Sequence, residues 1–258
     1  MNPTLFISHG APNMILSDLK SKQSIIDIAK GLKKAKYIII VSAHYVTRDL
    51  KVINPNTNSL MYDFYGFEEA LYNFKYEISS SLEYTNNLIE KLQNQGIIIS
   101  VDKTRDSFDH GVWTVLSLMY KKLEIPVIQL SIPISYSIID LINLGEKLQV
   151  FKDEALLIFS GGATHNLRDM SYGNIKPYAK EFNDMIKDII ENGKEDLLKD
   201  IKNDVNFYKN HPTIEHIAPL FIAFGNAINK KGVSFNSEML LSNISMESFI
   251  FDKGDLDA

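Results

Sequence analysis

The sequence predicts an α/β fold: a single domain with a central, mostly parallel sheet, helices flanking it, and a C-terminal antiparallel hairpin. Three observations predict it. Apolar runs of strand length alternate with longer segments whose apolar residues recur at helical spacing. The 258 residues, 45% of them hydrophobic, suit one domain of this class better than two of half the size. No repeat or low-complexity tract marks a linker, so we expect one domain over residues 1–258.

Four apolar runs are expected to form strands of this sheet. They are rich in β-branched and other apolar residues and stop at small or polar ones, as expected for strands covered on both faces. In chain order, the runs extend from Thr4 up to His9, and over Lys36–Tyr45, Pro126–Ile132 and Ala155–His165.

Five segments that follow these runs are expected to be helical, because several place apolar residues at i, i+3 and i+4. They are Ser21–Lys33, Ser80–Gln95, Val112–Lys122, Ser135–Val150 and Lys176–Asn192.

The last part of the chain has a strand pattern in place of the alternation of strands and helices. Two short runs, Gly232–Leu241 and Ser245–Asp252, are expected to form the antiparallel hairpin around Ser242 and Asn243.

Charge and composition exclude several classes of protein. A formal net charge of −5 leaves no basic excess for contact with nucleic acid. The absence of cysteine excludes disulfides, thiolate nucleophiles and cysteine zinc sites. The N-terminus has no secretory pattern, and no apolar run approaches the ~20 residues that cross a bilayer. We therefore expect a cytoplasmic protein without a membrane partner, and both monomer and dimer stay open.

The candidate functional residues are the six histidines, three of which occupy equivalent places. His9, His44 and His165 each lie at or just after the carboxyl end of a predicted strand. Such ends meet along one edge of a parallel sheet, where open α/β folds bind their ligands. One histidine in this position is most often structural, but three favour a shared site. Neutral imidazoles suit a divalent transition metal such as Zn(II) or Fe(II).

The other three histidines flank expected helix starts. His110 follows Asp109, and the positive end of the helix dipole there favours a neutral imidazole. Pro212 suits a first helical turn, which would place His216 about one turn further in. His211 and His216 lie about 140° apart around an ideal helix, so that helix could not direct both at one metal. One of them is expected to support the site from outside.

Seven segments, in order from about Leu5 to Gly225, are similar to one known family. They read SHGAPN, VSAHY, YDFYGFEEALYNFKY, DHGVWTVL, IPVIQLSI, GGATHNLRDM and PTIEHIAPLFIAFG. As an ordered set they resemble the class III extradiol ring-cleavage dioxygenases, in their DOPA-dioxygenase-like branch. The resemblance implies one divalent metal, Fe(II) for activity or Zn(II) as bound. It also implies a small aromatic diol substrate, whose ring O2 opens beside the two hydroxyl groups.

The resemblance assigns the metal ligands and the catalytic histidines. His9, His44 and His216 match the three ligands, although other branches use glutamate at the third position and Glu215 lies beside His216. His165 matches the acid/base histidine, which can lie close enough to a metal to count as a fourth ligand. The resemblance also implies that His110 hydrogen-bonds bound oxygen or substrate. Asp63, Tyr65 and Arg168 are candidates to orient the substrate, and their ordinary alternatives are a helix cap, a core aromatic and a surface ion pair, respectively.

One departure and two rival functions stay open. Glu77 stands where relatives usually have proline, in a loop expected to border the substrate pocket, so the substrate itself is open. A zinc hydrolase would use the same imidazoles to lower the pKa of a bound water. A non-catalytic binding protein could also retain this fold, although the presence of every matched histidine favours the enzyme.

Overall fold

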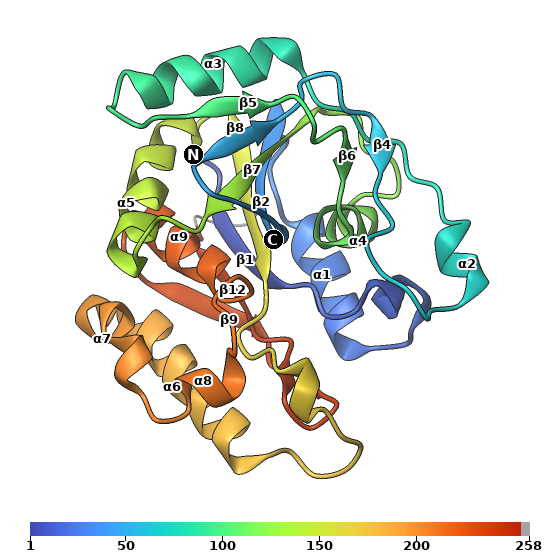
Figure 1. The fold of residues 1–258 in the computed structure, drawn as a ribbon, viewed down its shortest axis with the longest axis vertical. Coiled ribbons are helices and arrows are strands. Elements are labelled where there is room, and N and C mark those ends of the chain that lie inside the picture. The colour runs from blue at the N-terminus through green and yellow to red at the C-terminus, as the bar shows by residue number, and fades with distance from the viewer. Residues whose placement is uncertain (254–258) are drawn as a thin grey trace.

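The computed structural model describes residues 1–253, which form the predicted α/β domain around an eight-stranded sheet (Figure 1). The predicted domain continues to residue 258, and residues 254–258 lie outside the described part. The strands of the main sheet are β1 (Thr4–Ser8), β2 (Tyr37–Thr47), β3 (Lys51–Ile53), β5 (Ser100–Asp102), β7 (Val127–Pro133), β8 (Ala155–Gly161), β9 (Gly232–Asn236) and β12 (Ser248–Phe251). Their spatial order is β5-β3-β7-β2-β8-β1-β12-β9.

The four central strands β7, β2, β8 and β1 are mutually parallel, as predicted. β3 pairs antiparallel with β7 but parallel with β5, and β12 and β9 extend the other edge in antiparallel pairing. A separate two-stranded ladder joins β4 (Ser59–Leu60) to β6 (Ser107–Phe108). The carboxyl ends of the four parallel strands therefore share one edge of the sheet.

Helices cover both faces of the sheet (Figure 1). One face packs against α1 (Lys20–Lys30) and α4 (His110–Met119), and the other against α5 (Ile138–Leu148), α6 (Pro177–Asn192) and α9 (Ala218–Asn226). α3 (Leu82–Gln93) packs near β5. The short helices are α2 (Glu69–Tyr72), α7 (Glu195–Lys199) and α8 (Phe207–Asn210). None of the helices within residues 1–253 is both long enough and apolar enough to cross a membrane.

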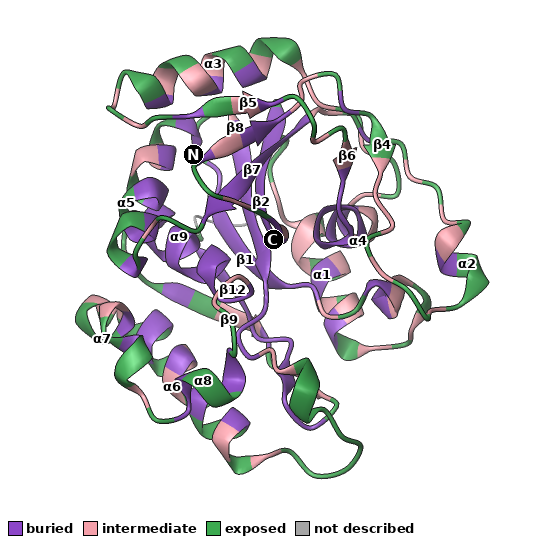
Figure 2. Ribbon diagram, viewed as in Figure 1, coloured by how far each residue is buried: buried purple, intermediate pink, exposed green. Residues whose placement is uncertain are grey.

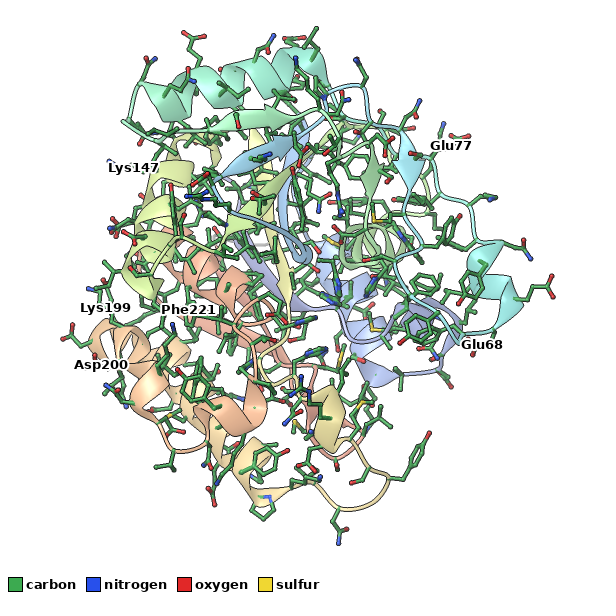
Figure 3. All side chains as sticks on the ribbon, viewed as in Figure 1. Glu68, Glu77, Lys147, Lys199, Asp200 and Phe221 are labelled. Atoms are coloured by element: carbon green, nitrogen blue, oxygen red, sulfur yellow. The ribbon has the colours of Figure 1, made fainter. Side chains whose placement is uncertain are left out.

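The core is divided into two layers by the sheet. In β2, Ile38 and Ile40 join the layer that contains α1 and α4, whereas Ile39 and Val41 join the layer under α5 and α9. This alternation follows from the two-residue period of a strand. Figure 2 shows the resulting buried centre. In Figure 3, Phe221 of α9 lies inside the molecule, while charged side chains such as Glu68 lie on its periphery.

The five predicted helices and the four predicted strands are present, with small shifts at their ends. One shift concerns the site, because the run predicted to reach His165 leaves the sheet after Gly161. There the Gly162 N–H donates to the His216 carbonyl at 2.7 Å, and the Ala163 N–H donates to Ser8 Oγ at 3.2 Å. These bonds replace the strand ladder, so His165 lies in the connection that follows β8.

The helix predicted around Pro212 is wrong in position. Residues 212–217 form a turn, and α9 begins at Ala218 with Pro219 in its first turn. Pro219 lacks an N–H and suits the first turn of a helix, where that N–H would be unpaired in any case. The His216 carbonyl meanwhile accepts from Gly162 rather than from a helical N–H. His216 is therefore held by the turn before α9, and the helical-angle argument does not apply to it.

The C-terminal hairpin is present, but each predicted strand is divided in two. The outer parts are β9 and β12, which pair antiparallel within the main sheet. The inner parts, β10 (Met239–Leu240) and β11 (Ile244–Ser245), form a small hairpin of their own. Leu241 and Ser242 form its turn, with φ angles of 45° and 64°. The predicted turn position is thus confirmed to within one residue.

Candidate metal centre

Five of the six histidines meet at the carboxyl edge of the parallel strands. His9 directly follows β1, His44 lies in β2, and His110 is the first residue of α4. The Nε2 atoms of His9 and His44 lie 3.0 Å apart, and the ring centroids of His44 and His110 lie 3.9 Å apart. The centroid of His216 lies 5.0 Å from that of His44, and the His165 ring stacks on His216 at 3.5 Å. The predicted convergence of His9, His44 and His165 is therefore present.

His44 lies in an irregular part of β2. Val41 pairs with Leu130 of β7, but the next pair joins Val46 to Ile132, so β2 contains extra residues at this point. Such bulges change the direction of a side chain and are frequent beside functional sites. The His44 N–H donates to the hydroxyl of Ser42 at 3.2 Å within the irregular segment.

A buried carboxylate stabilises this segment against the start of α4. Asp109, which is fully buried, accepts from Ser42 Oγ at 2.6 Å and from Gln129 Nε2 at 2.5 Å. Arg105 Nη2 donates to the same carboxylate at 2.7 Å. Asp109 is also the residue that immediately precedes α4. The bond from Ser42 therefore connects the His44 segment to the turn that carries His110, and the bonds from Gln129 and Arg105 satisfy the second oxygen of the carboxylate.

Asp63 contacts histidines, in addition to the substrate role predicted for it. Its Oδ1 accepts from the backbone N–H of His110 at 3.0 Å and from His110 Nδ1 at 2.9 Å. Its Oδ2 lies 3.7 Å from Nδ1 of His44. Burial alone would raise the pKa of Asp63, but the hydrogen bonds that it accepts from His110 outweigh burial and lower the pKa. Asp63 therefore orients His110 so that its Nε2 is free to face the other imidazoles.

Burial keeps four of these imidazoles neutral, namely those of His9, His44, His165 and His216. The pKa values of His9 and His216 are lowered well below the usual value, first by burial and then by repulsion from neighbouring histidines. Burial likewise lowers the pKa of His44 and of His165 to about 4. Neutral imidazoles carry a free lone pair, which is the form that binds metals.

The donor set fits a divalent transition metal. One ligand atom from each of His9, His44 and His110 can be chosen so that all three lie within 4.8 Å of one another. His216 lies against the same group, with its ring centroid 5.6 Å from that of His9. Imidazoles of this number and spacing suit Zn(II) or Fe(II) far better than the hard ions Mg²⁺ and Ca²⁺, which prefer oxygen ligands. The group can therefore hold a single metal.

His211 is the histidine that supports the site from outside. Its Nε2 donates to the Ala163 carbonyl at 2.9 Å, and its ring packs against Phe182 and Phe207. Burial lowers the pKa of His211 to about 4. Ala163 lies two residues before His165, so this bond holds the backbone of the connection that carries His165.

Two of the predicted substrate residues lie on the surface, and the loop that contains Glu77 lies away from the histidines. Tyr65 is 92% exposed, and Arg168 is exposed in the short 3-10 segment Leu167–Asp169. The expectation that Glu77 borders the substrate pocket is wrong. Val127, at the start of β7, donates its N–H to the Ser79 carbonyl at 2.9 Å. This bond places the Glu77 loop at the amino ends of the parallel strands, opposite the histidines, and Figure 3 shows Glu77 at the periphery.

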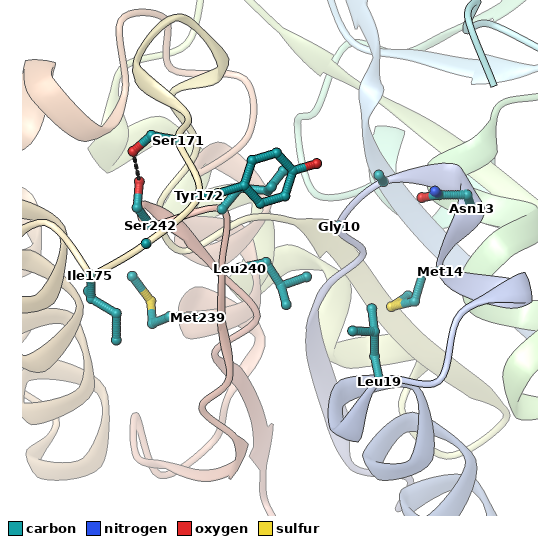
Figure 4. A pocket seen from close by; sticks show the side chains of 13 residues that line it. Gly10, Asn13, Met14, Leu19, Ser171, Tyr172, Ile175, Met239, Leu240 and Ser242 are labelled. Atoms are coloured by element: carbon teal, nitrogen blue, oxygen red, sulfur yellow. Dashed lines mark hydrogen bonds between the residues drawn. The ribbon is translucent and has the colours of Figure 1, made fainter.

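A cavity of about 410 Å³ opens between segments that continue from the histidines (Figure 4). One wall begins at Gly10, directly after His9, and a second wall, Ser171–Ile175, belongs to the connection that carries His165. The third wall comes from the β10–β11 hairpin. All the residues that line the cavity are uncharged. It can therefore accept a neutral, partly apolar group.

Sequence reasoning missed the polar residues that hold the histidines in place. Ser42, Gln129 and Ser160 are fully buried and lie in strands. Each interrupts an otherwise apolar run, namely IIIVSAH, PVIQLSI and LLIFSGG. Buried polar side chains need hydrogen-bond partners, so a polar residue inside such a run is the signal that could have identified them.

Comparison with known proteins gives concordant results. Residues 3–247 match the family described as the catalytic LigB subunit of aromatic ring-opening dioxygenase. A protein from Beta vulgaris named 4,5-DOPA dioxygenase extradiol is 36% identical over 232 residues, covering 87% of this chain and 86% of the relative. An Escherichia coli K12 protein of the same name is 34% identical, with 86% and 84% covered. A crystal structure of an uncharacterized Escherichia coli K12 protein superposes with a TM-score of 0.82 at 27% identity, covering 97% of this chain and 100% of that one.

Proposed function

Because the chain belongs to the family of the catalytic LigB subunit of aromatic ring-opening dioxygenases, we propose that this extradiol dioxygenase acts on a DOPA-like catechol. The reaction class is an extradiol ring cleavage, in which O2 opens an aromatic diol beside its hydroxyl groups. The observation that carries the substrate proposal is the group of imidazoles at the sheet edge, together with an uncharged cavity whose wall begins at Gly10, directly after His9. Relatives named 4,5-DOPA dioxygenase extradiol support a substrate of the DOPA type.

His9, His44 and His216 are the proposed ligands of one divalent metal. The 3.0 Å approach of the His9 and His44 Nε2 atoms supports the first two ligands. The third follows from the match of His216 to the family motif, and its ring lies beside both of the others. Fe(II) is the proposed metal of the active enzyme, and Zn(II) can bind to the same nitrogens. When bound, Fe(II) supplies the site for the catechol oxygens and for O2.

The remaining two imidazoles have separate roles in this proposal. His165 is neutral at pH 7, so a ring nitrogen can accept a proton from a catechol hydroxyl and later return it. His110 donates its Nδ1–H to Asp63, so in the neutral ring Nε2 can accept a hydrogen bond from the substrate. The substrate ring is proposed to lie between these rings and the cavity. Tyr65 and Arg168 stay predictions for binding its substituent.

The function is tested by loading the chelated protein with Fe(II) under anaerobic conditions, then adding O2 and a panel of catechols that includes DOPA. A yellow ring-opened product is the expected result, and the His44→Ala variant should form none. The Lys30→Ala variant, far from the site on α1, is the matched control. Ester hydrolysis by the zinc-loaded protein, without ring opening, would instead identify a hydrolase. Catechol binding without turnover would identify a binding protein.

The third ligand is tested by comparing His216→Ala with His110→Ala. The spacing of the ligand atoms also admits His110, so the two variants separate the assignments. We expect His216→Ala to lose metal on dialysis, and His110→Ala to retain it while turnover falls. The reverse result would assign the third position to His110. Metal content is measured by atomic absorption beside the initial rate on a catechol.

Location and assembly stay predictions from composition. The acidic, cysteine-free sequence favours the cytoplasm. Cell fractionation with an antibody against the protein tests the compartment. Light scattering tests whether the chain is a monomer or a dimer.

A further inference from the structure

Ser160 lies between His9 and the first turn of α4. It is fully buried in β8, next to β1 in the sheet. Its Oγ lies 2.9 Å from Nδ1 of His9 and 2.6 Å from the carbonyl oxygen of Gly111. The His9 N–H also donates to the Gly161 carbonyl at 3.0 Å, which fixes the His9 backbone beside Ser160. Ser160 is thus the hydrogen-bond partner of the His9 nitrogen that points away from the other imidazoles.

The direction of these hydrogen bonds follows from counting protons. A carbonyl oxygen can only accept, so the single hydroxyl proton of Ser160 must point at Gly111. The Oγ lone pair then faces His9, and Nδ1 must carry the hydrogen of that bond. In a neutral imidazole only one nitrogen is protonated, so Nε2 keeps its lone pair. That Nε2 is the atom 3.0 Å from Nε2 of His44.

We propose that Ser160 is a positioning residue, whose hydroxyl holds His9 in the Nδ1–H tautomer and keeps the Nε2 lone pair directed at the metal. The proposal rests on the proposed function only in treating His9 as a metal ligand. Metal-binding histidines generally donate their other N–H to an acceptor that fixes the ring, and removing that acceptor lowers metal affinity by about 10–100-fold. In this chain the acceptor is a serine that is itself oriented by the backbone of α4.

Close packing of α4 makes the orientation of Ser160 possible. A Cβ placed on Gly111 would lie 2.4 Å from Ser42 Oγ and 3.2 Å from Cδ2 of His44. The absence of a side chain therefore lets the first turn of α4 approach β2 and brings the Gly111 carbonyl within 2.6 Å of Ser160. The same turn, Asp109–Gly111, holds His44 through Ser42 and carries His110.

The tautomer is measured directly by nitrogen-15 NMR of the metal-free protein, with the His9 signal assigned from its loss in His9→Gln. We expect the Nδ1–H form in the wild type and a mixture of both tautomers in Ser160→Ala. The affinity for Zn(II), measured by competition with a chromophoric chelator, should fall about 10–100-fold in Ser160→Ala. Ser160→Thr keeps the hydroxyl and should restore both properties.

Ser131→Ala is the matched control, because Ser131 is equally buried in β7 but its hydroxyl accepts from Thr47 Oγ1 and from the Lys51 N–H. It should leave Zn(II) affinity and the His9 tautomer unchanged. An Nε2–H tautomer in the wild type would overturn the proposal, even if Ser160→Ala failed to fold. Unchanged affinity and tautomer in Ser160→Ala would also overturn it, as would an equal loss of affinity in Ser131→Ala. If the tautomer is as expected but the Fe(II) protein opens no ring, the proposed function fails and the Ser160 inference stands.

Discussion

The two halves of the histidine centre are built differently. The α4 half contains His9, His44 and His110, and the loop half contains His165 and His216. In the α4 half, His9 bonds to Ser160, and His110 bonds twice to Asp63. The His44 segment is held through Ser42 by the buried Asp109.

The loop half is held more loosely. Within residues 1–253, no hydrogen bond from another residue holds the His165 ring, and the ring of His216 has only Glu215, at 3.3 Å from its Nδ1. The connection after His165 is largely exposed, including Leu167 at 57% and Tyr172 at 94%. By contrast, α4 is almost entirely buried.

The difference matches two different chemical tasks. A metal needs ligands held in one geometry before it binds, which requires partners for the nitrogens that do not bind it. A group that accepts and returns a proton must instead reach the substrate, and an imidazole without a fixed partner can do so. The α4 half therefore suits the proposed ligands His9 and His44, and His165 of the loop half suits proton transfer. His216, the third proposed ligand, is held through its backbone, because its carbonyl accepts from the Gly162 N–H at 2.7 Å.

The largest expected effect separates the halves by function. His44→Ala removes a ligand, so both metal content and activity should be lost. His165→Gln should retain the metal while turnover on a catechol falls by roughly 10²–10⁴-fold, the usual contribution of a positioned acid/base. Metal content and rate are measured on the same Fe(II)-loaded samples. Equal loss of metal in both variants would make His165 a ligand, and the proton-transfer role would pass to His110.

Removing the buried charge of the α4 half should have the next largest effect. Asp109 accepts three hydrogen bonds, one of them from Arg105, which is 14% exposed. Asp109→Asn would leave the Arg105 guanidinium without its counter-charge. It would also place the new side-chain NH2 group against groups that themselves donate hydrogen bonds to Asp109. We expect the free energy of unfolding in urea to fall by about 3–5 kcal/mol.

The matched change in the loop half is Asp169→Asn. Asp169 pairs with Lys176 at the surface, where solvent screens the charges. The midpoint of urea unfolding of Asp169→Asn should stay close to that of the wild type. Similar losses in the two variants would show that both halves depend equally on their carboxylates, which contradicts the comparison.

A methyl group tests how tightly each half is packed. In Gly111→Ala the new Cβ would lie 2.4 Å from Ser42 Oγ, so we expect a loss of about 1–3 kcal/mol in unfolding free energy. In Gly162→Ala the nearest atom would be Cβ of His165 at 3.6 Å, an ordinary contact, and the loss should be smaller. Thermal and urea unfolding of Gly111→Ala and Gly162→Ala measure the two losses of unfolding free energy. A larger loss in Gly162→Ala would show that the loop half is the tighter one.

The sequence was sufficient to predict the positions of those histidines that lie at the ends of strands. His9 and His44 follow buried apolar runs, so their meeting at one edge was predictable from the parallel sheet. The place of His216 was not predictable, because Pro212 and Pro219 both suit the start of a helix. The bond from the Gly162 N–H to the His216 carbonyl shows that the helix starts with the second of them in its first turn.

The supporting hydrogen bonds could not be predicted at all from one sequence. Ser160 and Gly111 are 49 residues apart, and their contact depends on how closely α4 approaches the sheet. The same holds for Asp63, whose partner His110 lies 47 residues away. Periodicity identifies which face of an element is buried, but not which polar atoms meet within that face.

The last expected effect is a dependence of stability on pH, to which both halves contribute. Burial lowers the pKa of His44 and of His165 to about 4, whereas in the unfolded chain histidine titrates near 6.5. Between these values the unfolded chain binds protons that the folded chain does not, so the free energy of unfolding falls as the pH falls. Each histidine should change the folding equilibrium of the metal-free protein by roughly tenfold per pH unit. Urea unfolding from pH 7 to pH 5 should therefore be less steep in His165→Gln by about one proton, and an unchanged slope would show that the folded His165 ring already titrates as an exposed imidazole.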